Sequence, residues 1–146
     1  MSGKAPPDHI GWDLIRAARL WLAEFEAEVV AAGHPWFAEA RGRLIEHIGR
    51  TGVEQGALAA RSGMTKQAVA QHLDALERDG LVRRVGVDGD HRKRRVVWTM
   101  QGQAALDDID AAKGRVEARL RRRMGEDAFL NLRAGLKMVA ADRQGT

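Results

Sequence analysis

The chain has 146 residues, of which 45% are hydrophobic and 30% are charged, and its formal net charge is +4. This length predicts a single domain, and the apolar runs are far shorter than the roughly 20 residues that cross a bilayer, which excludes a membrane span. The absence of cysteine excludes disulfides, thiolate metal sites and a cysteine nucleophile. The first ten residues match neither a secretory signal nor a transit peptide, so we expect a cytoplasmic location.

The positive charge is concentrated in the middle of the chain. Residues 50–100 contain ten Lys or Arg and six Asp or Glu, whereas the remainder contains fourteen of each. A positive region of this kind is expected of a surface that meets phosphates, although a solvated basic loop would give the same count.

The N-terminal part predicts a long helix over residues 12–32. Its apolar residues recur at spacings of three and four, which places them on one helical stripe: Ile15, Ala18, Leu22, Phe25 and Val29. Pro35 disfavours helical geometry at His34, so a turn is expected there. A second helix is then predicted from about Trp36 to Gly49.

The next segment predicts a helix-turn-helix. A short helix near Glu54–Ser62, anchored by Leu58, precedes a compact turn, and a longer helix follows over about Lys66–Asp79. Thr65 is suited to be its N-cap, because the hydroxyl can accept a backbone N–H of the first turn. Gly80 suits the left-handed position after the helix end.

The periodicity then changes to that of strands. Residues 81–87 and 93–99 are rich in Val and are separated by Asp88, Gly89 and Asp90, which predicts a two-stranded hairpin with Val96 and Trp98 facing the core. Two more helices are predicted over 102–124 and 127–141. The expected fold class is therefore mainly α with a small two-stranded β-wing, in the order of a winged helix-turn-helix.

The longer helix of the predicted motif has a polar face. If Val69, Leu73 and Leu76 are buried, the opposite side carries Lys66, Gln67, Ala70, Gln71 and Asp74. Gln67 and Gln71 can offer paired donors and acceptors to adenine edges, and Lys66 can reach guanine acceptors or phosphates. The small Ala70 would let the helix approach closely. The alternative is an ordinary solvated helix face.

Six positive residues fall within thirteen positions around the hairpin: Arg83, Arg84, Arg92, Lys93, Arg94 and Arg95. Asp88 and Asp90 are the acidic residues near them in sequence, so a polyanion is the expected partner. A wing arginine can also enter the minor groove, whose negative potential attracts guanidinium. The alternative is that these charges pair with acidic residues on other helices.

At these residues the sequence resembles the multiple antibiotic resistance regulator (MarR) family. The segment from Leu58 to Val85 is similar to the family's helix-turn-helix and first wing strand. Residues 90–102 are similar to its wing signature, an Asp-x-Arg followed by a strand and a Thr-x-x-Gly helix start. Two departures are Glu54, where the family usually has a capping Thr or Ser, and Gly56 in the first helical turn. Residues 36–49 match only loosely.

The resemblance implies which residues meet DNA. Thr65, Lys66, Gln67 and Gln71 would contact it from the recognition helix, and Arg92 would be the wing arginine, oriented by Asp90. Together with the charge pattern, this gives the expected set of double-stranded DNA-binding residues: Thr65, Lys66, Gln67, Ala70, Gln71, Arg84, Arg92, Lys93 and Arg94.

The resemblance also implies a homodimer. We expect one MarR-like domain over residues 1–146, with a winged-helix lobe over 36–100 and dimerisation helices over 11–32 and 103–141. A two-fold dimer would place its recognition helices about 34 Å apart and favour a palindromic site. The alternative is a monomer with a self-contained core.

Family members often respond to small aromatic compounds. An effector pocket is therefore expected between the dimer helices and the DNA-binding lobe, and the residues that could line it are Trp12, Trp21, Phe25, Trp36 and Phe37. Plain core packing is the alternative interpretation of these aromatic residues.

The sequence lacks the usual marks of an enzyme. The five histidines show no pair at metal-ligand spacing, and there is no P-loop, dinucleotide fingerprint or Gly-x-Ser-x-Gly elbow. We therefore expect no metal, no cofactor and no enzymatic activity. The predicted function is a sequence-specific transcriptional regulator, as a repressor that a small ligand releases. The alternative is a sensor or protein-interaction module whose winged helix does not read DNA.

Overall fold

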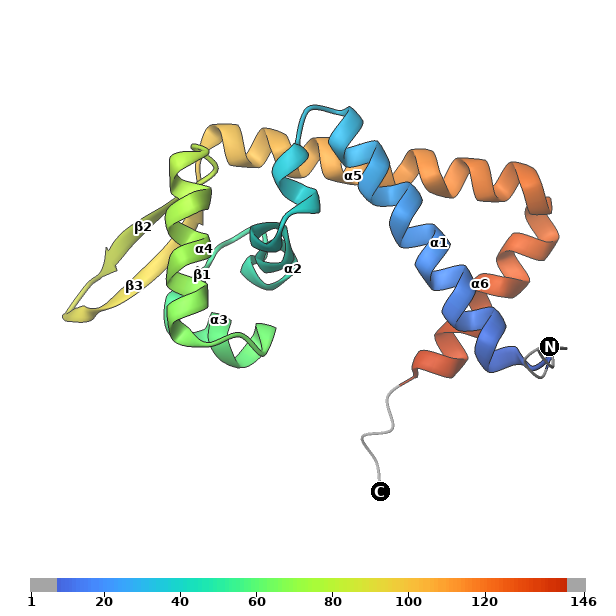
Figure 1. Cartoon of the computed structure of the whole chain (residues 1–146), viewed down its shortest axis with the longest axis horizontal. Helices are drawn as coiled ribbons and strands as arrows, with labels where there is room; N and C mark the ends of the chain where they lie inside the picture. The colour runs from blue at the N-terminus through green and yellow to red at the C-terminus, as the bar shows by residue number, and fades with distance from the viewer. Residues whose placement is uncertain (1–7, 142–146) are drawn as a thin grey trace, which may run out of the picture.

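The computed structural model describes residues 8–141. Its elements run in the following order: α1 Ile10–Ala31, η1 Pro35–Ala38, η2 Ala40–Leu44, α2 Ile45–Ile48, β1 Val53–Glu54, α3 Gln55–Ser62, α4 Lys66–Arg78, β2 Val82–Val87, β3 Asp90–Trp98, α5 Met100–Met124 and α6 Glu126–Ala140. Figure 1 shows these elements as an arch, in which the long helix α5 forms the top. The lobe with the strands lies at one end of α5, and α1 and α6 lie toward the other end.

The helix-turn-helix is formed by α3 and α4. Thr65 caps α4 as predicted, because its Oγ1 accepts a hydrogen bond of 3.1 Å from the backbone N–H of Ala68. Gly63 ends α3 in the left-handed conformation, at φ +71°. Gly80, at φ +76°, lets the chain leave α4 and enter β2. Glu54 makes no side-chain capping bond at the start of α3.

The predicted helix over residues 36–49 is wrong. This stretch contains two 3₁₀ segments and only one turn of α-helix. Glu39 has an extended backbone, φ −93° and ψ 170°, which separates η1 from η2. The chain also folds back closely here, since a Cβ on Gly42 would lie 2.2 Å from the carbonyl oxygen of Phe37. Glycine at position 42 and proline at position 35 favour this broken path over a continuous helix.

The sheet has three antiparallel strands in the order β1-β3-β2, so the predicted two-stranded wing was incomplete. The hairpin of β2 and β3 turns at Asp88 and Gly89, and the second strand begins three residues earlier than predicted, at Asp90. Strand β1 pairs Val53 with Val96 and Glu54 with Arg95. Its two residues carry no periodicity of their own, which is why sequence alone did not reveal the strand.

One hydrophobic core runs through the lobe and into the arch. In the lobe, the fully buried side chains include Leu58 of α3 and Leu73 and Leu76 of α4. Val96 and Trp98 of β3 face this core, as the alternation predicted. From α1, Phe25 and Val29 extend the core to η1 and to the buried face of α5.

The predicted helices at both ends of the chain are confirmed, but much of their apolar surface lies outside the protomer core. Within residues 8–141, all of the large hydrophobic residues with an exposed side chain except Met100 belong to α1 or α6: Ile10, Trp12, Ile15, Leu20, Leu22, Val30, Leu130, Leu132, Leu136, Met138 and Val139. In α6 only Phe129 is buried. Among residues 8–141, no helix is long and apolar enough to cross a membrane.

Candidate nucleic-acid interface

Helix α4 presents the polar face that its sequence predicts. Val69, Leu73 and Leu76 are no more than 1% exposed, which fixes the rotation of the helix about its axis. The opposite side carries the exposed residues Thr65, Lys66, Gln67, Gln71 and Asp74, with the half-buried Ala70 among them. Because Ala70 has a small side chain, a ligand can approach the helix backbone closely at the centre of this face.

A groove of about 400 Å³ adjoins the start of α4. It lies between α3, α4 and β3, and its walls are formed by Glu54, Gln55, Gly56, Ala57, Ala59, Lys66, Val69, Arg92, Lys93 and Arg94. The N-terminal end of α3 opens into it, with backbone N–H groups that Glu54 does not cap. Such groups and the helix dipole favour an anion. The sequence did not place Gln55 or Gly56 in a site, because their position in the groove depends on the fold bringing β3 beside them.

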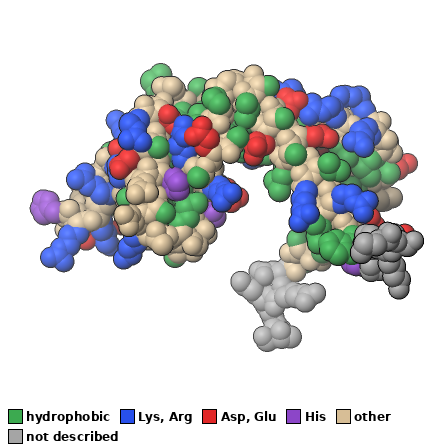
Figure 2. Space-filling view, in the orientation of Figure 1, with side chains coloured by type: hydrophobic (Ala, Val, Ile, Leu, Met, Phe, Trp, Pro, Cys, Tyr) green, Lys and Arg blue, Asp and Glu red, His purple; other side chains and the backbone are tan. Residues whose placement is uncertain are grey.

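The wing carries exposed positive charge. Arg92, Lys93 and Arg94 are all exposed on β3. Lys93 is 3.9 Å from the carboxylate of Glu54, whereas no acidic residue of the described range forms an ion pair with Arg92 or Arg94. In Figure 2 the Lys and Arg side chains gather at the end of the molecule where Figure 1 places the hairpin.

Asp90 acts on the backbone of the wing. Its Oδ1 accepts a hydrogen bond of 2.9 Å from the backbone N–H of Arg92. Asp90 makes no hydrogen bond to the Arg92 guanidinium, so it influences the Arg92 side chain only through the backbone. Asp90 stabilises the turn from which Arg92 extends, and Gly89 completes that turn at φ +81°.

Arg84 does not join the exposed cationic surface. Its guanidinium hydrogen-bonds both carboxylate oxygens of Glu77, at 3.2 and 2.9 Å, and also contacts Asp74. These carboxylates raise the pKa of Arg84 and, in return, its guanidinium holds the pKa of Glu77 below the ordinary value. The charge of Arg84 therefore joins β2 to α4, so its guanidinium is less available to DNA than the sequence predicted. The pairing of wing charges with a neighbouring helix, left open from the sequence, applies to this residue.

The aromatic residues fall into two places. Trp21, Phe25, Trp36 and Phe37 form a chain of ring contacts, with ring centroids 5.2 to 6.1 Å apart. Phe25 and Trp36 in this chain are buried in the core. Trp12 lies apart, 44% exposed near the start of α1. Among residues 8–141, no group of three or more His, Asp or Glu could hold a metal ion.

Comparison with known proteins shows that these features are similar to those of one family. A model of the MarR family matches residues 40–93, from η2 to the start of β3. The transcriptional repressor CouR, solved bound to a 23-mer DNA duplex, is 26% identical with a TM-score of 0.68, over 90% of this chain and 92% of that one. The resemblance to the MarR family is confirmed.

Two further solved structures extend the match beyond the wing. A MarR-family transcriptional regulator from Rhodococcus sp. RHA1 is 23% identical with a TM-score of 0.65, over 95% of this chain and 97% of that one. NadR in complex with 4-hydroxyphenylacetate is 20% identical with a TM-score of 0.60, over 97% of this chain and 99% of that one. The MarR fold thus includes α1, α5 and α6. Among curated proteins, no sequence matches significantly.

Proposed function

We propose that this protein is a transcriptional regulator that binds double-stranded DNA through α4 and the wing. The observation that carries the proposal is a groove that brings Lys66, at the start of the glutamine-bearing helix α4, close to the exposed Arg92 and Arg94 of β3. Helix α4 enters the major groove, where Gln67 and Gln71 read base edges and Lys66 reaches guanine or phosphate. Thr65 adds a polar contact, and Ala70 permits close approach.

The positive residues around the groove bind the DNA backbone. Arg92, Lys93 and Arg94 neutralise phosphates, and Arg92 is placed to reach the minor groove beside the wing. The free N–H groups at the start of α3 receive one more phosphate oxygen. Arg84 has no part in this contact. CouR, which was solved bound to DNA, is named a transcriptional repressor, and we propose repression here as well. A regulator of this kind acts on the chromosome, so we propose a cytoplasmic location and no enzymatic activity.

The DNA-binding form is a homodimer. Helices α1 and α6 carry the exposed large hydrophobic residues named above, and apolar surface of this kind usually marks a protein interface. We propose a single domain in which residues 36–100 form the DNA-binding lobe and the helices in 11–32 and 103–141 form the dimer. A two-fold axis would repeat α4 about one DNA turn away and select a palindromic site.

A small aromatic effector is the proposed release signal. NadR was solved with 4-hydroxyphenylacetate. In this chain the partly buried Trp21 and Phe37 lie beside the core, where a second subunit could complete a pocket. Titration with small phenolic acids should quench Trp fluorescence and weaken DNA binding together, because linkage makes the two effects reciprocal.

Selection of genomic fragments tests the proposed function. The purified protein is incubated with fragments of the source genome, and the bound fraction is sequenced. We expect a palindromic motif shared by the selected fragments and a protected length that spans two half-sites. Recovery of fragments without a common motif would contradict sequence-specific recognition and favour a sensor that does not read DNA.

A further inference from the structure

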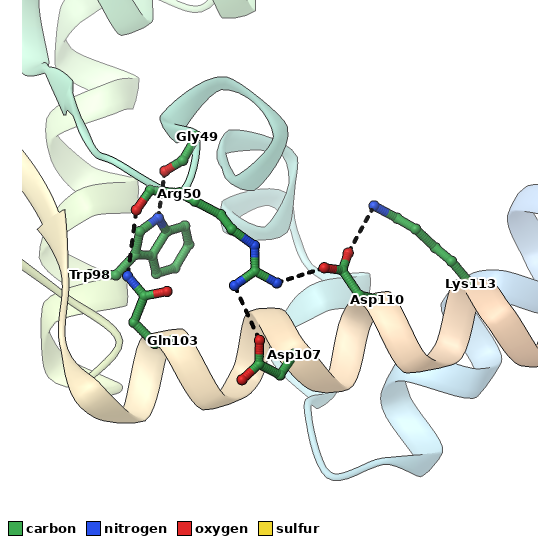
Figure 3. Close-up of polar contacts among 7 residues, drawn as sticks. All are labelled: Gly49, Arg50, Trp98, Gln103, Asp107, Asp110 and Lys113. Carbon is green, nitrogen blue, oxygen red and sulfur yellow. Dashed lines mark hydrogen bonds and ion pairs between the residues drawn. The ribbon is translucent and has the colours of Figure 1, made fainter.

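The turn between α2 and β1 is held by side chains from β3 and from the first turn of α5. Three consecutive carbonyl groups each accept a hydrogen bond: Gly49 from Trp98 Nε1 at 2.7 Å, Arg50 from Gln103 Nε2 at 3.4 Å, and Thr51 from Arg95 at 2.9 Å. Gly52 completes the turn with its backbone against Val96, whose carbonyl oxygen would lie 2.4 Å from an added Cβ. The turn is therefore fixed against β3 and the start of α5 (Figure 3).

From this turn the Arg50 side chain extends along α5. One of its terminal nitrogens is 3.1 Å from Asp107 Oδ1 and the other is 2.5 Å from Asp110 Oδ2. Gln103, Asp107 and Asp110 follow at helical spacing, so all three lie on the side of α5 that faces the turn (Figure 3). Lys113 is also 3.5 Å from Asp110, which extends the charged row.

The contact between Arg50 and the two aspartates of α5 lies where it can restrict movement of the lobe relative to α5. The lobe passes directly into α5 at Thr99, whose hydroxyl contacts the carbonyl groups of Gly80 and Leu81. Gly102 packs on the same place, where a Cβ would lie 2.0 Å from the oxygen of Leu81. These contacts fix the first turn of α5, and Leu106 and Ile109 further along the helix belong to the same hydrophobic core as the lobe. The ion pairs of Arg50 with Asp107 and Asp110 lie about one and two helical turns beyond Gly102. They therefore resist rotation of the lobe about the first turn of α5.

We propose that Arg50 is a positioning residue that sets the angle between the winged lobe and α5. The inference rests on the proposed function for its consequence: in a dimer joined through α1 and α6, this angle determines the separation of the two recognition helices. Arg50 thereby selects the spacing between DNA half-sites without touching DNA. Loss of its two carboxylate contacts frees the lobe to accept several spacings.

The first experiment measures binding to a series of sites. The two halves of the selected palindrome are separated by the natural spacer or by one or two base pairs more or fewer. The wild type should show one optimum. Arg50→Ala should bind the natural spacing about tenfold more weakly and bind the altered spacings with similar affinity to each other. Its affinity for a single half-site should be unchanged. The Asp107→Asn/Asp110→Asn double variant should reproduce this profile, and Arg50→Lys should fall between.

Two outcomes of this series would overturn the inference. If Arg50→Ala keeps the wild-type spacing profile, the contact does not set the angle. If it loses affinity for the single half-site as strongly as for the palindrome, Arg50 acts on DNA or on the stability of the lobe. Thermal unfolding of each variant separates a loss of folding from a loss of spacing preference.

A second measurement needs no DNA. Because the chain has no cysteine, two introduced cysteines are the only sites that a thiol-specific spin label modifies. The substitutions are Asp88→Cys in the wing turn and Gly114→Cys on α5. A side chain added at position 114 meets open space. Labelled protein is mixed with excess unlabelled protein, so that distances within one chain are recorded. The distribution should be narrow in the wild type and broad in Arg50→Ala. Equal widths would overturn the inference, even if the protein proves not to bind DNA.

Discussion

At the scale of single residues, the functional distinction is between charges that the protein uses internally and charges that it leaves exposed. Arg84 and Arg92 both belong to the basic wing, yet Arg84 is held by Glu77 and Asp74 while Arg92 contacts Asp90 only through its backbone. The sequence predicted the basic cluster but not this division. Glu77 and Arg84 lie on a helix and a strand, and their pairing depends on how α4 packs on β2.

Replacing Arg92 by alanine should weaken binding to all DNA sequences. The proposed phosphate contact releases about one counterion, so the slope of log K against log salt should become shallower by about 1. Arg122→Ala removes the same charge at the far end of α5 and should leave the slope unchanged. Fluorescence anisotropy across a salt series measures both. An identical decrease in slope for both variants would show a general charge effect and contradict a wing contact.

The Arg84–Glu77 pair should make stability sensitive to acid. Arg84 lowers the folded-state pKa of Glu77 below 4.5, so the pair contributes stability above the unfolded pKa, and this contribution is lost as the pH falls through the folded value. Glu77→Gln should lower the free energy of unfolding at neutral pH by about 1 kcal/mol. Urea unfolding should then show a smaller loss for the variant than for the wild type between pH 5 and pH 3. Parallel pH profiles would argue against the pair.

At the scale of elements, the sequence predicted the parts whose structure is local. The apolar periods of α1, α4, α5 and α6 and the cap at Thr65 belong to single segments, and all of them are confirmed. The broken path over residues 36–49 was missed because it depends on Gly42 lying against the Phe37 backbone. Strand β1 exists only through its pairing with β3. The contacts of Arg50 were likewise absent from any sequence pattern, since they join residues far apart in the chain.

Two glycines on α5 give opposite predictions for the same substitution. Gly102→Ala forces a methyl group against the Leu81 carbonyl and the Trp98 ring and should destabilise the fold by about 1–3 kcal/mol. Gly114→Ala meets open space and should stabilise the helix by up to about 1 kcal/mol, because alanine has the higher helix propensity. Chemical denaturation measures both changes. Equal effects would contradict the close packing of α5 on the lobe.

At the scale of the whole molecule, the arch separates two surfaces that need a partner. The polar face of α4 and the wing lie at one end, and the exposed apolar residues of α1 and α6 lie toward the other (Figure 1). The protomer covers neither. Helix α5 connects them, so any change in how two copies pack would be carried to the spacing of the DNA-binding lobes.

The proposed dimer predicts a sharp difference between two substitutions of exposed hydrophobic residues. Leu136→Asp places a charge in the apolar surface of α6 and should produce monomers, because a buried unpaired charge is costly. Met100→Asp changes a residue that is 92% exposed on the lobe side of α5 and should leave the dimer intact. Analytical ultracentrifugation at micromolar concentration distinguishes the two. A monomeric wild type, or a Leu136→Asp variant that remains dimeric, would contradict this interface.

The central claim is that α4 reads base sequence while the wing supplies general affinity. Its most direct test compares binding to the selected genomic fragment with binding to a shuffled duplex of equal length, for the wild type and for Gln67→Ala/Gln71→Ala, at several salt concentrations. The account predicts that the wild type prefers its fragment by about 10³ or more. The double variant should lose most of this preference and keep the wild-type salt slope on the shuffled duplex. A wild type that binds both duplexes equally, or a double variant that keeps the preference, would contradict it.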